Sequence, residues 1–235
     1  MRKKRPALSK AETARRRYLW LLGSVFAVFW LALAIHPIDR SAWLLENALL
    51  VAGLGVLIVS YRAFPLSRVS YTTICIFLCL HTIGAHYTYS EVPWREWLAA
   101  LTGGEASLEG RNHFDRVVHF SYGLLLAYPI REVFLRIANV RGFWGYFLPL
   151  DLTMSTSMLY ELLEWAAASL FGGGLGTAFL APQGDEWDAQ KDMALAALGA
   201  LLAMTTIALI NARSKRDFAA EWADSLRVKQ KKPLE

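Results

Sequence analysis

Six long apolar stretches constrain this chain more than any other feature of its sequence. A helix needs about 20 predominantly apolar residues to cross the hydrocarbon core of a bilayer. Stretches of roughly this length cover residues 18–35, 43–61, 71–89, 115–131, 143–170 and 188–210. A hydrophobic content of 55% and a mean hydropathy of +0.30 are too high for an ordinary soluble domain. We therefore predict an all-α fold, a polytopic membrane helix bundle with about six transmembrane helices.

Basic residues are distributed unequally between the two predicted sides of the membrane. Twenty of the 25 Lys and Arg residues lie in the tails 1–17 and 212–235 or in the connections 61–70 and 131–142. The remaining five are Arg40, Arg95, Arg111, Arg116 and Lys191. Because cytoplasmic segments are enriched in Lys and Arg, both termini are predicted to be cytoplasmic. The expected organisation is a basic tail (1–17), a six-helix transmembrane domain (18–211) and a second basic tail (212–235).

The formal net charge of +5 raises the question of a nucleic-acid partner. The basic residues stand in tails and short loops beside apolar spans, where anionic membrane lipid is the simpler partner. We therefore expect membrane lipids as partners and no nucleic acid. The two cysteines, Cys75 and Cys79, lie inside an apolar stretch and are expected to pack between helices.

Three connecting or terminal segments have distinctive patterns. Residues 93–101 place Trp94, Trp97, Leu98 and Leu101 on one helix face, which indicates a short helix in the outer interface or one packed over the bundle. Residues 172–184 are rich in glycine but fairly apolar, and we expect them to fold over the bundle as a lid. In the C-terminal tail, an apolar stripe among basic residues predicts a cytoplasmic surface helix; it consists of Phe218, Trp222 and Leu226.

Ionisable residues inside the apolar stretches occur mainly as pairs at helical spacing. The pairs are Asp115 with His119, Glu161 with Glu164, and Asp188 with Asp192, and two further histidines are His81 and His86. With the predicted topology, all of them lie toward the outer ends of their helices. Charged groups are costly inside a membrane and are expected to face the bundle interior, to pair, or to line water. The sequence therefore predicts a sunken, outward-facing site.

The chemistry of these residues favours a divalent metal ion as cofactor. Helical bundles build carboxylate and histidine metal sites from such pairs on several helices. Oxygen ligands suit Mg, Mn or Ca, and the histidines also allow Zn or Fe. Each pair also has a structural alternative. Asp115 fits a helix N-cap, His119 a hydrogen-bonded core histidine, and Asp188 and Asp192 the positive end of a helix dipole.

Two function classes remain open from the residues alone. The first is a membrane-embedded enzyme, a metal-dependent hydrolase or transferase acting on a lipid-linked or periplasmic molecule of the cell envelope. Its catalytic residues would be Glu161 or Glu164 as base, with His119 and Asp115 as ligands or acid. The second is a transporter or binding protein that uses the same carboxylates for protons or cations. The sequence lacks the HExxH, GxSxG, phosphate-loop and CxxC motifs.

Four motifs in the chain also resemble the YjdF-like family of predicted bacterial inner-membrane proteins. They cover residues 81–89 (HTIGAHYTY), 111–120 (RNHFDRVVHF), 160–165 (YELLEW) and 183–192 (QGDEWDAQKD). The resemblance implies a multi-pass protein of the bacterial cytoplasmic membrane, without implying a reaction. The second half is also similar to the VanZ-like membrane proteins. Asp115 and His119 match their D-x-x-x-H start, while Glu164 replaces a Gln and Ala196 an Asn of the later motifs.

Overall fold

The computed structural model describes residues 10–103, 110–171, 185–214 and 217–229, and within these ranges it is helical without strands. The all-α prediction is confirmed. The helices are α1 (Lys10–Leu33), α2 (Arg40–Ser60), α3 (Arg68–His86), α4 (Trp94–Thr102), α5 (Phe114–Ile137), α6 (Trp144–Phe171), α8 (Asp188–Ser214) and α9 (Phe218–Ser225). The six long helices coincide with the six apolar stretches. The predicted lid, residues 172–184, lies outside the described residues.

The polarity of the bundle is that of a membrane protein. Among the described residues, four helices (α1, α2, α3 and α8) are both long and apolar enough to cross a bilayer. Helices α5 and α6 have 24 and 28 residues, which is a sufficient length. Large apolar side chains face outward, with Val59 and Leu170 each 82% exposed. Ionisable side chains such as Glu46 and Asp192 are buried instead. The bundle therefore presents apolar side chains to lipid and keeps polar ones inside.

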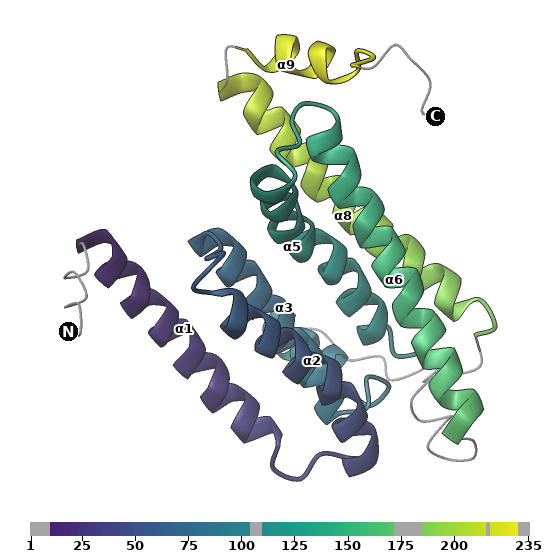
Figure 1. Ribbon diagram of the computed structural model, residues 1–235. Coiled ribbons are helices and arrows are strands. Elements are labelled where there is room, and N and C mark those ends of the chain that lie inside the picture. The colour runs from purple at the N-terminus through teal and green to yellow at the C-terminus, as the bar shows by residue number, and fades with distance from the viewer. Residues whose placement is uncertain (1–9, 104–109, 172–184, 215–216, 230–235) are drawn as a thin grey trace.

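The long helices form two groups of three (Figure 1). Helices α1, α2 and α3 lie on one side, while α5, α6 and α8 lie on the other, and α3 packs against α5 to join the groups. Two helix starts have side-chain caps. Asp39 accepts hydrogen bonds from the backbone amides of Ser41 and Ala42 at the start of α2, and Ser67 accepts one from Ser70 at the start of α3.

Small residues allow α5 and α8 to pack very closely. A Cβ atom on Gly123 of α5 would lie 1.9 Å from the carbonyl oxygen of Ala196 of α8. A Cβ atom on Gly199 of α8 would lie 2.2 Å from the carbonyl oxygen of Phe120 of α5. Ala196 and Ala200 are completely buried in this contact. Such contacts are typical of membrane helices, where small residues let two backbones approach. The two helices are parallel, so this contact brings their polar N-terminal turns together.

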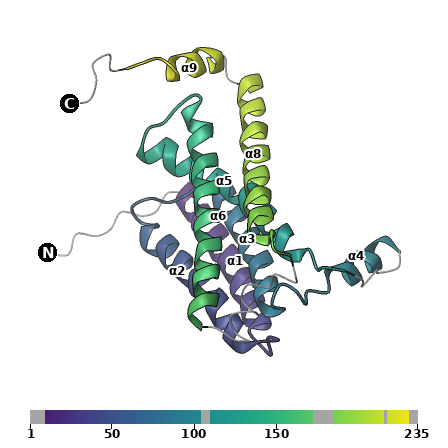
Figure 2. The same ribbon diagram turned by 90° about the vertical axis from the view of Figure 1, so that its right-hand side faces the viewer.

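The two short helices take up different positions (Figure 2). Helix α4 projects from the side of the bundle and leaves Leu98 and Leu101 exposed, as expected for a helix at a membrane interface. Helix α9 lies across the far end of the bundle, and the rings of Phe218 and Trp222 pack against Tyr146 of α6. The predicted apolar stripe of the C-terminal tail therefore forms a helix, and two of its members contact protein.

Candidate functional site: a histidine and carboxylate cluster beside an apolar cavity

Three of the predicted site residues converge where α5 and α8 begin. Asp115, His119 and Asp192 each offer one ligand atom, and these atoms all lie within 4.8 Å of one another. Asp115 and His119 are one turn apart on α5, and the close α5–α8 contact brings Asp192 opposite them. We call these residues the Asp–His–Asp cluster. His119 and Asp192 are 8% and 2% exposed, while Asp115 is half-buried, so the cluster has little exposed surface.

Helix α6 contributes Glu161 to the same place. Nε2 of His119 lies 3.5 Å from Oδ1 of Asp115 and also 3.5 Å from Oε1 of Glu161. Glu164 is half-buried one turn further along α6, and it interacts electrostatically with Glu161 and Asp115. Three carboxylates, one each from α5, α6 and α8, therefore lie close to the imidazole of His119, and Glu164 stands one turn beyond Glu161.

The cationic side chains near the cluster are engaged by two other carboxylates. Arg111 forms an ion pair with Asp188, and Arg116 forms ion pairs with Asp185 and Asp188. Lys191 Nζ lies 2.7 Å from Asp185. The hydrogen bond from Lys191 is the main reason that the pKa of Asp185, which lies before α8, is lowered to about 2. Predicted site residue Asp188 thus belongs to a charged rim beside the cluster.

The deeper carboxylates have no such compensation within the described residues. No Lys or Arg in the described part of the chain forms an ion pair with Asp115, Asp192 or Glu161. Oδ1 of Asp192 and Oε1 of Glu161 are buried without a hydrogen-bond partner there. Buried acceptors are normally satisfied, and uncompensated charge is costly. Both atoms are therefore available to a bound cation or to a proton.

The two other histidines of the predicted site lie on α3 outside the Asp–His–Asp cluster. His81 Nδ1 lies 2.6 Å from the Tyr89 hydroxyl, and its Nε2 lies 3.3 Å from the backbone carbonyl oxygen of Glu46. A carbonyl only accepts, so Nε2 carries the proton and Tyr89 donates to Nδ1. His86 Nδ1 donates to the carbonyl oxygen of Leu33 at 2.7 Å. These hydrogen bonds hold α3 to α1 and α2, and they occupy both ring nitrogens of His81.

Glu46 of α2 is a buried polar residue that the helical-spacing argument left out of the predicted site. The hydroxyl of Tyr160 on α6 donates a hydrogen bond to Glu46 Oε2 at 3.2 Å, across 114 residues of sequence. Tyr160 also places its ring edge against His119, with the ring centroids 5.9 Å apart. Glu46 is a lone acid inside an apolar span, which is the one sequence signal that points to it.

An apolar cavity of about 700 Å³, which we call the central cavity, begins at these residues and extends between α2, α3, α5 and α6. Its polar lining consists of Asp115, His119, His81, Tyr89 and Tyr160 at this end, with Tyr122, Thr156 and Ser157 about one turn deeper. Its remaining walls are mainly apolar, including Leu49, Leu54 and Leu57 of α2, Phe77 of α3, and Leu126 and Ile130 of α5. The volume falls in the range of ligand pockets. The cavity therefore combines one polar end with a long apolar body.

The Asp–His–Asp cluster has the donor set and the size for a divalent cation. Ligand atoms on opposite sides of Ca²⁺ are about 5 Å apart, and those of smaller ions are closer. Two carboxylates and one imidazole suit Mn, Fe or Zn as well as the harder ions. Glu161, with a free buried oxygen beside His119, is placed to act as a fourth ligand or as a base.

The chain was compared with known families, proteins and structures. It matches the family described as "Predicted membrane protein (DUF2238)" over residues 18–213. It is 35% identical over 185 residues to the inner membrane protein YjdF of Escherichia coli (strain K12), an alignment that covers 77% of this chain and 84% of that protein. No solved structure is significantly similar.

These matches confirm the YjdF resemblance and the multi-pass inner-membrane location, while the VanZ-like resemblance stays a prediction. The family match extends across all six long helices and includes every residue of the Asp–His–Asp cluster. The chain therefore belongs to the DUF2238 family of predicted membrane proteins.

Proposed function

We propose that this protein is a metal-dependent enzyme embedded in the inner membrane, whose substrate is a lipid-linked molecule of the cell envelope. Asp115, His119 and Asp192 hold the cation in this proposal. The observation that carries it is the position of the cluster, because Asp115 and His119 also line the polar end of the central cavity. A lipid chain in the apolar body of this cavity would bring its polar head to the cluster.

Charge balance supports a cation at this position. The rim cations Arg111, Arg116 and Lys191 pair with Asp185 and Asp188, whereas the deeper carboxylates have no Lys or Arg ion-pair partner among the described residues. A divalent ion held by Asp115, His119 and Asp192 would neutralise part of this charge and would supply a bound water of lowered pKa. Glu161 Oε1, 3.5 Å from His119 Nε2, is placed to accept the proton of that water. The reaction class is hydrolysis or transfer at the head of the lipid.

The alternative, a transporter using the same carboxylates, requires polar groups through the other half of the membrane. In α6, Thr153 and Thr156 donate hydrogen bonds at 2.7 Å to the carbonyl oxygens of Pro149 and Leu152 in their own helix. Asp151 is exposed on the outside of α6. These positions favour a site open to one side over a route through the bundle.

Metal content is the first test. We expect about one equivalent of Mg, Mn, Ca, Zn or Fe in purified wild-type protein, or after incubation with each ion and removal of the excess. His119→Asn should lose at least tenfold in affinity, because it removes one ligand of three. The matched control is His36→Asn, an exposed histidine at φ +50°, a conformation that Asn tolerates. Wild-type protein that binds none of these ions overturns the proposal.

Activity on lipid is the second test. Purified protein is incubated with total inner-membrane lipid, with and without EDTA, and the lipids are compared by mass spectrometry. Gly53 lines the central cavity and Gly55 lines neither described pocket, while a Cβ on either residue would meet open space. A product should therefore form with wild type and Gly55→Phe. It should be lost with EDTA, His119→Asn or Gly53→Phe. Metal binding without any lipid product would reduce the proposal to a cation-binding protein.

A further inference from the structure

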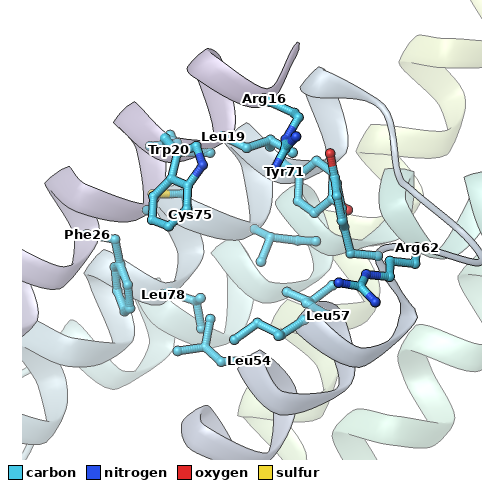
Figure 3. A pocket seen from close by; sticks show the side chains of 15 residues that line it. Arg16, Leu19, Trp20, Phe26, Leu54, Leu57, Arg62, Tyr71, Cys75 and Leu78 are labelled. Atoms are coloured by element: carbon cyan, nitrogen blue, oxygen red, sulfur yellow. The ribbon is translucent and has the colours of Figure 1, made fainter. Parts of the chain in front are cut away.

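A second apolar pocket of about 490 Å³ lies between α1, α2 and α3 (Figure 3), and it adjoins the central cavity, with which it shares Leu54, Leu57, Ile74 and Leu78. We call it the α1 groove. Its polar residues gather at one end, where Figure 3 shows Arg16, Arg62 and Tyr71, and its apolar residues extend away from them to Phe26, Leu54 and Leu78. The groove therefore has a cationic mouth and an apolar body.

The length of the α1 groove matches one leaflet of a bilayer. Its lining on α1 extends from Arg16 to Phe26, which corresponds to about 15 Å along the helix axis. The hydrocarbon core is about 30 Å thick, so one leaflet contributes about 15 Å. Trp20, Tyr61 and Tyr71 line the half near the arginines, where aromatic side chains stand at membrane interfaces. An acyl chain of one leaflet thus fits the groove from end to end.

The two arginines at the mouth differ from the other arginines nearby in their interaction partners. Arg15 donates a hydrogen bond to the Leu66 carbonyl oxygen, and Arg68 stacks over the ring of Tyr18. Arg16 and Arg62 are exposed, and neither has a hydrogen-bond, ion-pair or ring partner among the described residues. Arg16 lies on α1 and Arg62 in the turn that follows α2, and both line the same mouth. Two unpaired guanidinium groups at a headgroup level form a receptor for an anion, and guanidinium binds phosphate through paired hydrogen bonds.

We propose that the α1 groove binds one anionic glycerophospholipid from the leaflet that contains the N-terminal end of α1. Arg16 and Arg62 bind its phosphate and anionic headgroup, and one acyl chain lies along Gly23 and Phe26. By the predicted topology this is the cytoplasmic leaflet. The lipid fills a gap beside α2, a helix that packs mainly against α3, and it thereby joins α1 to α2. Arg16, Arg62, Gly23 and Phe26 line this groove and not the central cavity, so the lipid contact proposed here does not require the metal or the reaction proposed above.

Native mass spectrometry of full-length protein in detergent tests the headgroup contacts. Phosphatidylglycerol and phosphatidylethanolamine with identical acyl chains are titrated separately. Wild type should retain one phosphatidylglycerol at least tenfold more strongly than phosphatidylethanolamine, and Arg16→Gln/Arg62→Gln should abolish this preference. The control, Arg17→Gln/Arg213→Gln, removes the same charge from exposed positions outside the groove and should behave as wild type. The proposal is overturned if both double variants lose the preference for phosphatidylglycerol equally, or if wild type does not prefer phosphatidylglycerol to phosphatidylethanolamine.

A variant that leaves the arginines intact tests the acyl-chain contact. A Cβ on Gly23 would meet open space, so Gly23→Phe fills the groove without displacing a neighbour. It should reduce retention of phosphatidylglycerol at least tenfold, whereas Gly55→Phe should retain it. Unchanged retention in Gly23→Phe with its melting temperature intact means that the lipid binds elsewhere, which overturns the assignment of this groove.

Discussion

Gly123 and Ala196 bring α5 and α8 into backbone contact, since a Cβ atom on Gly123 would lie 1.9 Å from the Ala196 carbonyl oxygen. A larger side chain at position 123 would collide with the backbone of α8, and backbone atoms cannot move aside by changing rotamer. This contact also sets the distance between His119 and Asp192, which stand one turn away on the two helices. The packing of two small residues is therefore a condition for the Asp–His–Asp cluster.

Gly123→Leu should separate α5 from α8 and destabilise the protein. We expect a loss of about 3 kcal/mol, at the upper end of the usual cost of overpacking, together with loss of cation binding. Gly55→Leu enters open space on α2 and should leave the melting temperature within a few degrees of wild type. Thermal unfolding in detergent measures both variants. A Gly123→Leu protein with normal stability would contradict the packing argument.

Asp192→Asn should have opposite effects on stability with and without metal. In EDTA the variant should melt higher than wild type, because it removes a buried charge with an unsatisfied oxygen. With cation at 100 times its Kd, wild type should gain about 2.7 kcal/mol, and the variant much less. Asp151→Asn neutralises an exposed aspartate of α6 and should respond to metal as wild type does. The idea fails if EDTA leaves the wild-type melting temperature unchanged.

Asp185 should make stability sensitive to strong acid. Its pKa is lowered from 3.8 to about 2 by hydrogen bonding to Lys191, so the folded state favours the ionised form. The resulting stabilisation is complete above the unfolded pKa and disappears as the pH falls through about 2. Asp185→Asn should therefore melt below wild type at pH 6, and this difference should shrink between pH 4 and pH 2. A constant difference across that range would exclude the ionised carboxylate as its origin.

Trp222→Ala should loosen the start of α6. Trp222 packs against Phe143 and Tyr146, and burial of an aromatic side chain typically contributes about 1.5–3 kcal/mol. We expect faster hydrogen exchange of the amides at residues 142–147, measured by mass spectrometry. Trp165→Ala removes an exposed indole from the other end of α6 and should leave this exchange unchanged. If the amides of residues 142–147 exchange equally fast in both variants, α9 does not stabilise the start of α6.

The sequence was sufficient to predict the helices and the polar end of the bundle. Charged residues in apolar stretches are rare enough that Asp115, Glu161 and Asp192 could be assigned to one depth before their contacts were known. Which of them meet depends on the rotation of each helix about its axis, and for α5 and α8 that rotation is fixed by the contact at Gly123. Hydropathy patterns do not record this contact. For this reason the pairing of Arg111 with Asp188, and the position of His81 apart from the cluster, emerged only from the structure.

Polar residues without a partner at helical spacing were the hardest to place. Glu46 meets Tyr160 across 114 residues, so no local pattern links them. The start of α1 was also missed, since helix α1 begins at Lys10, within the segment predicted to be a basic tail. Lys and Arg are good helix formers, and a charged segment can extend an apolar helix beyond the membrane. Hydropathy therefore predicted the apolar part of this helix and not the residue at which the helix begins.

The contact of α9 with the start of α6 has a consequence for biogenesis. The backbone amides of Gly142 and Phe143 donate to Glu221 and Ser225 of α9, and the indole of Trp144 donates to the Ser225 carbonyl oxygen. The first amides of a helix have no partner inside it, and α9 is translated some 75 residues after them. These hydrogen bonds can therefore form only after α8 and α9 have been synthesised, so the start of α6 lacks them while the chain is still being translated.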